Sequence, residues 1–195
     1  MLEVLAGTES GLNAVQIARL ARRGTRTGQR PVLDRLVEHG LVIAEPANTG
    51  YLYRLNRDHV LTPTVLAAVG ARAQVLERLT RACEQVEPRP VHASVFGSFA
   101  RREAGPDSDI DLMLVVGDDV DTQEAAFVDQ LRSLEDRVLA WTGNRLETLV
   151  FTGARLAQVV GAREPIVATW STEAVTLFGS EPAVLVTQAG KKVRR

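Results

Sequence analysis

Two aspartates separated by a single residue, near the middle of the chain, could hold a divalent cation. Asp109 and Asp111 flank Ile110, and an apolar run follows through residue 116. Because successive side chains of a strand point to opposite faces, both carboxylates should project to one side while Ile110 enters the core. Close carboxylates repel each other and raise each other's proton affinity. Oxygen-only ligands favour Mg²⁺ or Mn²⁺ over zinc, so the pair predicts a site for one of these ions.

A glycine and a serine precede the aspartates and could bind phosphate. Gly97 and Ser98 follow the strand-like run 91–96 and open a short helical segment. A strand that ends in this way brings backbone N–H groups and a hydroxyl to one point, where the helix dipole also favours negative charge. Carboxylates that hold a cation, next to a phosphate-binding turn, are the groups that nucleotidyl transfer needs.

This combination resembles the signature of the nucleotidyltransferases of the DNA polymerase β superfamily, in particular the minimal nucleotidyltransferase type. Six residues of this chain fall on the pattern: Gly97, Ser98, Arg101, Ser108, Asp109 and Asp111. The resemblance implies that Asp109 and Asp111 hold Mg²⁺ or Mn²⁺. It also implies that Gly97, Ser98, Arg101 and Ser108 bind the nucleotide, with Ser98 on its phosphates.

The resemblance further implies a third catalytic carboxylate on a later strand. Glu147 lies in the strand-like segment 145–151, where it would complete the metal site and help to deprotonate the nucleophile. Two positions depart from the pattern: Arg102 replaces a common glycine, and Glu147 replaces a frequent aspartate. The implied reaction transfers an NMP from an NTP to an acceptor hydroxyl on protein, RNA or a small molecule, with release of pyrophosphate. The alternative is a transcriptional regulator or antitoxin-like component, without catalysis, whose nucleotidyltransferase fold only senses nucleotide or metal.

The first sixty residues predict a winged helix-turn-helix. Asn13 should cap a helix that ends at Arg22, and a second helix, with Val32 among its inward-facing residues, should end at His39 before Gly40. Two strand-like segments, 41–43 and 51–55, follow, with turn-forming residues between them. The segment resembles the winged-helix regulators of bacteria.

The basic residues near the second helix predict binding to double-stranded DNA, because that helix enters the major groove in this fold. Arginine and glutamine can contact guanine and adenine edges, and threonine can contact phosphates. The predicted DNA-binding residues are Arg22, Arg23, Thr25, Arg26, Thr27, Gln29, Arg30 and Arg54. The alternative is a solvated basic face on a protein-interaction module.

The whole chain therefore predicts an α+β protein with four segments. These are a winged helix-turn-helix at 1–60, a linker helix at 61–90, a mixed-sheet nucleotidyltransferase domain at 91–182 and a basic C-terminal tail at 183–195, in which residues 191–195 should be frayed. Within the third segment, Thr122 should cap a helix that ends at Gly143. The apolar stripe of the linker helix should pack against a neighbouring domain, and a homodimer seam is the alternative.

The composition is that of a soluble globular protein, with 45% hydrophobic and 24% charged residues and a formal net charge of -1. The single cysteine, Cys83, rules out an internal disulfide and fits a reducing compartment. The sequence shows no signal-peptide pattern and no membrane-spanning apolar run. We therefore expect a cytoplasmic protein that does not bind membranes.

Overall fold

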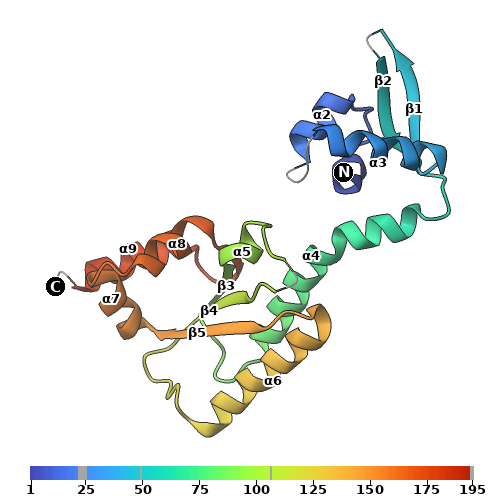
Figure 1. Cartoon of the computed structure of the whole chain (residues 1–195). Helices are drawn as coiled ribbons and strands as arrows, with labels where there is room; N and C mark the ends of the chain where they lie inside the picture. Colours follow the sequence, from blue (N-terminus) through green and yellow to red (C-terminus); the bar gives the residue numbers. More distant parts are fainter. Residues whose placement is uncertain (22–25, 49, 106, 194–195) are drawn as a thin grey trace. The chain divides into compact units, whose positions relative to one another are not determined.

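The computed structural model describes residues 1–21, 26–48, 50–105 and 107–193, without the side chains of residues 26, 27, 192 and 193. The chain divides into two compact units, Met1–Ala73 and Gln74–Arg195 (Figure 1). Among the described residues, no helix is both long and apolar enough to cross a membrane.

The N-terminal unit consists of short helices followed by a hairpin of two antiparallel strands (Figure 1). The elements are α1 (Leu2–Ala6), α2 (Ala14–Leu20), α3 (Arg26–Glu38), β1 (Val42–Ala47) and β2 (Gly50–Leu55). Their core is formed by buried apolar side chains, among them Leu5, Ile17, Leu33 and Leu55.

Local capping signals set the ends of these helices. The Asn13 side chain accepts a hydrogen bond from the Gln16 N–H at 2.9 Å, and the Gln16 side chain accepts one from the Asn13 N–H at 2.8 Å. This capping box confirms Asn13 as the N-cap, although α2 ends at Leu20 rather than Arg22. Gly40, with φ of +71°, lies just after α3, in the left-handed conformation that ends many helices.

The inward face of α3 is narrower than its sequence predicts. Leu33 is buried, and Leu36 and Val37 pack against the same core. Val32 is 38% exposed, which corrects the prediction that it faces inward. One residue corresponds to 100° of rotation around a helix, so Val32 and Leu33 cannot share the centre of one face.

Helix α4 (Thr62–Glu84) contributes to the cores of both units. It begins at Thr62, with Pro63 in the first turn, where proline is tolerated. Val65 packs against the core of the N-terminal unit, while Leu79 and Cys83 are fully buried in the core of the C-terminal unit. The helix predicted between the two segments is therefore present, and both of its ends are packed.

The C-terminal unit is built on a mixed four-stranded sheet with the order β5-β4-β3-β6. Strands β4 and β5 are parallel, and the other two pairs are antiparallel. In chain order the elements are β3 (His92–Phe96), α5 (Gly97–Ala100), β4 (Ile110–Val116), α6 (Ala125–Thr142), β5 (Leu146–Thr152), α7 (Gly153–Gly161), α8 (Pro165–Glu173), β6 (Val175–Phe178) and α9 (Pro182–Val193). The predicted mixed sheet and the α+β class are confirmed.

Helices cover both faces of this sheet. Alternating residues of β4 point to opposite sides. Ile110, Leu112 and Leu114 pack with α4 and α6, whereas Met113 and Val115 pack with α7, α8 and α9. Figure 1 shows α6 on one side of the strands and α7, α8 and α9 on the other. The inner strands β3 and β4 are therefore buried along most of their length. Asp111 of β4 and Glu147 of β5 are less buried and lie at the end where these strands begin.

Two expectations for this unit need correction. Helix α6 begins at Ala125 rather than at Thr122. The Asp121 carboxylate accepts the Gln123 N–H at 2.9 Å and the Asp121 carbonyl accepts the Glu124 N–H, so a turn precedes the helix. Residues 182–193 form α9, so residues 191–193, which were predicted to be frayed, are helical. Apolar side chains of this helix, including the buried Ala189, pack in the core with α7 and α8.

Candidate active site

Three acidic residues lie where β4 and β5 begin. Asp111 is the second residue of β4 and pairs in register with Glu147 of β5 and Phe96 of β3. Directly paired residues of neighbouring strands point to the same face. Asp109 immediately precedes β4, two residues before Asp111. The three acids for which the resemblance implies catalytic and metal-binding roles thus lie at the same end of neighbouring strands.

Among these three acids, the pKa of Asp111 is shifted by its surroundings. Asp111 is half-buried, while Asp109 and Glu147 are exposed. Burial raises the pKa of the Asp111 carboxyl above its ordinary value, and the negative charges of Asp109 and Glu147 raise it further. The positive charge of Arg101 acts in the opposite direction. This environment therefore disfavours the charged form of Asp111 relative to a carboxyl group free in water.

The absence of a side chain at Gly97 allows the Asp111 carboxylate to approach the backbone closely. The Gly97 φ of +68° lies in the left-handed region that favours glycine. A Cβ atom added to Gly97 would lie 2.1 Å from Oδ2 of Asp111. The carboxylate therefore rests against the backbone of the turn that carries Gly97 and the half-buried Ser98. Any side chain at position 97 would displace it.

Arg101, predicted to bind the nucleotide, is held by two carboxylates. Its Nε donates to Oε2 of Glu103 at 2.7 Å, and its Nη1 donates to Glu173, the last residue of α8. The second contact spans 72 residues of sequence. Sequence reasoning missed Glu173, because no spacing rule connects the end of α8 with the turn after β3.

Ser108, also predicted to bind the nucleotide, helps to shape the loop before Asp109. Its Oγ accepts the Gly105 N–H at 2.9 Å. The side-chain amide of Asn144 donates to the Ser108 carbonyl at 2.7 Å and to the Gly105 carbonyl at 3.1 Å. Asn144 was not predicted, and its only signal is its place between Gly143, which ends α6, and β5. It fastens the loop that leads to Asp109 to the chain segment that leads to Glu147.

The donor set suits a hard divalent cation. The three side chains offer carboxylate oxygens, which Mg²⁺ and Mn²⁺ prefer. Within the described parts of the chain, however, no three acidic, histidine or cysteine side chains come close enough to form one metal site. The fit therefore rests on the chemistry of the donors and on their mutual effect on Asp111.

The predicted DNA-binding residues are only partly described. Arg22, Arg23 and Thr25 lie outside the described residues, and Arg26 and Thr27 are the first two residues of α3. Arg30 pairs with Asp34 at 3.1 Å, and Arg54 pairs with Glu45 at 2.8 Å. Exposed pairs of this kind are weak, so both arginines can exchange partners.

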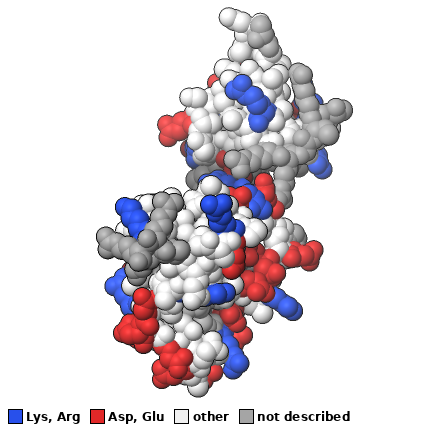
Figure 2. Space-filling view, turned by 90° about the vertical axis from the view of Figure 1, so that its left-hand side faces the viewer, with Lys and Arg blue, Asp and Glu red and all other residues white. Residues whose placement is uncertain are grey.

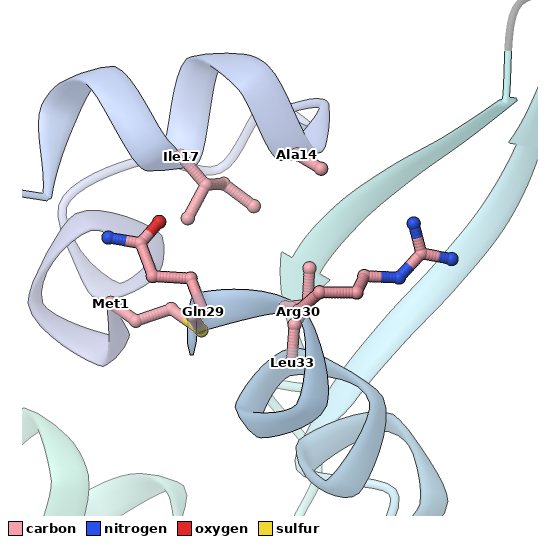
Figure 3. Close-up of a pocket in the computed structure, with 6 residues that line it drawn as sticks. All are labelled: Met1, Ala14, Ile17, Gln29, Arg30 and Leu33. Carbon is pink, nitrogen blue, oxygen red and sulfur yellow. The ribbon is translucent and has the colours of Figure 1, made fainter. Parts of the chain in front are cut away.

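Gln29, another of the predicted DNA-binding residues, is partly buried. It lines a cavity of about 120 Å³ within the N-terminal unit, with Met1, Ala14, Ile17, Arg30 and Leu33. Figure 3 shows Gln29 and Arg30 extending from α3 in different directions. The Gln29 amide oxygen is buried, because Gln29 lies one helical turn before the buried Leu33. A contact between Gln29 and a base edge stays a prediction.

Surface charge on the face in Figure 2 differs between the units. The described side chains of the N-terminal unit on this face are mostly uncharged, and acidic and basic side chains are interspersed over the C-terminal unit. The face in view therefore presents no broad basic surface among its described residues.

Comparison with known proteins agrees with the site geometry. Residues 76–150 match the Nucleotidyltransferase domain family. The sequence matches no curated protein. Similar solved structures include a toxin-antitoxin with AMP-PNP, at 14% identity and a TM-score of 0.41, covering 61% of this chain and 86% of that chain.

Two further structures are similar over 61% and 59% of this chain. A mutant of the toxin-antitoxin MntA-HpeT has 12% identity and a TM-score of 0.41, covering 61% of this chain and 86% of that one. A protein described as a nucleotidyltransferase from Sulfolobus solfataricus has 19% identity and a TM-score of 0.33, covering 59% and 89%. At these values the structures add nothing to what the family match shows. The chain therefore carries a nucleotidyltransferase domain at residues 76–150, as the resemblance of its motif implied.

Proposed function

We propose that the C-terminal unit transfers a nucleoside monophosphate from an NTP to an acceptor hydroxyl in the presence of Mg²⁺ or Mn²⁺. The observation that carries this proposal is the place of Asp111, which pairs with Glu147, lies against the Gly97 turn and has its pKa raised by the charges of Asp109 and Glu147. Divalent cations neutralise the triphosphate when they are bound. Asp109 and Asp111 would hold them, and Glu147 would complete the set.

The transfer balances as a substitution at the α-phosphorus. The acceptor oxygen forms a bond to the α-phosphorus, the bond from that phosphorus to the bridging oxygen breaks, and pyrophosphate leaves with the bonding electrons. Glu147, which is exposed on the edge strand β5, accepts the proton of the acceptor hydroxyl. Ser98 contacts the phosphates of the nucleotide. The acceptor is a hydroxyl of a protein, an RNA or a small molecule.

We propose as a second function that the N-terminal unit binds double-stranded DNA through α3. The order of α2, α3 and the β1–β2 hairpin supports this proposal, since it matches the order expected for a winged helix-turn-helix. Arg26→Ala combined with Arg30→Ala should weaken DNA binding and reduce its salt dependence, because fewer counterions are released. Nucleotide binding by the same variant should stay unchanged. Equal loss of both activities in a folded variant would contradict two independent functions.

The test of the enzymatic proposal is transfer of label from α-labelled NTPs in the presence of Mg²⁺. Purified protein is incubated with host lysate or total RNA, next to the double variant Asp109→Ala/Asp111→Ala. Label on a macromolecule with the unmodified protein alone supports transfer and identifies the class of acceptor. Mg²⁺-dependent NTP binding without any labelled product would instead support a regulator that senses nucleotide.

A further inference from the structure

Arg102 adopts a backbone conformation that is unfavourable for a residue with a side chain. Its φ is +62°, in the left-handed region. The Arg102 N–H donates to the Phe99 carbonyl at 3.2 Å, and the Glu103 N–H donates to the Ser98 carbonyl at 2.9 Å. These two bonds form a Schellman motif at the end of α5, and Arg102 stands where such motifs usually have glycine. The glycine common at this position in the resembling family fits the same requirement.

The motif places Arg102 beside the turn that is proposed to bind phosphate. The bond from Glu103 to Ser98 folds the chain back onto Ser98, one residue after Gly97, which rests against Asp111. Arg101, the neighbouring guanidinium, already donates to Glu103 and Glu173. Arg102 is exposed, and it adds a second positive charge to a loop that leads to the carboxylate cluster.

A second arginine in this unit has the same backbone motif in a different place. Arg163 has a φ of +55°. Its N–H donates to the Val160 carbonyl at 3.1 Å, and the Glu164 N–H donates to the Val159 carbonyl at 3.2 Å. It precedes α8, whereas Glu173 ends α8 beside Arg101. The nine residues of α8, roughly 13 Å of helix, therefore lie between Arg163 and Glu173. The two arginines share a backbone conformation and differ in location.

We propose that Arg102 binds the phosphate groups of the NTP, a role that rests on the proposed nucleotidyl transfer. A guanidinium can donate two parallel hydrogen bonds to a phosphate and carries its charge at any physiological pH. The free protein bears the cost of the left-handed backbone, which glycine would avoid, and the contact with phosphate stabilises only the complex with NTP. The contact is with phosphate and is therefore independent of the base.

The test compares Arg102→Gly with the matched control Arg163→Gly. Both variants should raise the melting temperature by about 2–4 °C, because both relieve the same backbone conformation. Only Arg102→Gly should weaken binding of Mg²⁺-NTP, by roughly tenfold, as expected for the loss of one charge-assisted hydrogen-bonding group. The loss should be equal for ATP and GTP. Arg102→Lys should restore part of the affinity, because it restores the charge.

The outcomes separate this inference from the proposed function. Unchanged NTP affinity in Arg102→Gly would overturn the role of Arg102 and leave nucleotidyl transfer intact. Equal weakening by both glycine variants would also overturn it, since the effect would then come from the backbone. Absence of Mg²⁺-NTP binding in the unmodified protein would overturn both proposals. Weaker binding confined to Arg102→Gly, together with a higher melting temperature, supports a phosphate-binding Arg102.

Discussion

The contact between Gly97 and Asp111 makes Gly97→Ala a sharp test of the candidate site. The new Cβ would lie 2.1 Å from the Asp111 Oδ2 atom, and real Cβ atoms essentially never approach another atom within 3.0 Å. The carboxylate must therefore move by at least 0.9 Å, the difference between these distances. A displacement of about 1 Å in a catalytic group can lower the rate on the order of 100-fold, which corresponds to roughly 2.7 kcal/mol.

The stability effect of the same change has a matched control in Gly143→Ala. Gly97 and Gly143 have φ angles of +68° and +75°, so alanine at either position costs roughly 1–2 kcal/mol for the left-handed backbone. A Cβ at Gly143 would meet no atom within 4 Å. The two variants should therefore lose similar stability, because Asp111 can rotate away from the new methyl group, and only Gly97→Ala should lose function.

The assay combines urea denaturation, titration of Mg²⁺-NTP and the rate of label transfer for both variants. The expected result is comparable unfolding free energies, with NTP binding and transfer severely reduced in Gly97→Ala alone. If Gly97→Ala bound and transferred nucleotide as well as Gly143→Ala does, the position of the Asp111 carboxylate against this turn would have no functional importance. That result would contradict a functional role for the contact between Gly97 and Asp111.

Two other changes test the charge and the support of the site. Asp111→Asn should stabilise the metal-free protein at neutral pH. The folded state raises the pKa of Asp111 above its ordinary value of 3.8, so it binds more protons than the unfolded state just above that pH. Stability should therefore fall as pH rises from 3.8 through the raised pKa, and the variant should lack this component. Urea denaturation across pH measures it, and parallel curves for both proteins would contradict it. Asn144→Ala removes two hydrogen bonds to the carbonyls of Gly105 and Ser108, each contributing about 1 kcal/mol. A loss of about 2 kcal/mol with slower transfer is expected from denaturation and label assays, and a change below about 0.5 kcal/mol would mean that Asn144 does not support the loop.

The sequence by itself determined the features that depend on neighbouring residues. The alternation of a strand predicts that Asp109 and Asp111 lie on one side of Ile110. Asn13 caps the start of α2 through local hydrogen bonds, and Gly143 ends α6 with a left-handed backbone. Each of these signals acts within a few residues, where bond geometry leaves few alternatives. The spacing of the motif residues is likewise local, and its resemblance to a known family implied the mixed sheet.

Tertiary structure decided which distant residues join the site. Glu147 lies beside Asp111 because β4 and β5 pair in parallel in one particular register. Glu173 reaches Arg101 because α8 packs on the sheet and ends there. Asn144 reaches the loop before Asp109 across 36 residues of sequence. These contacts follow from burying apolar faces on both sides of the sheet, which a local pattern of residues does not encode.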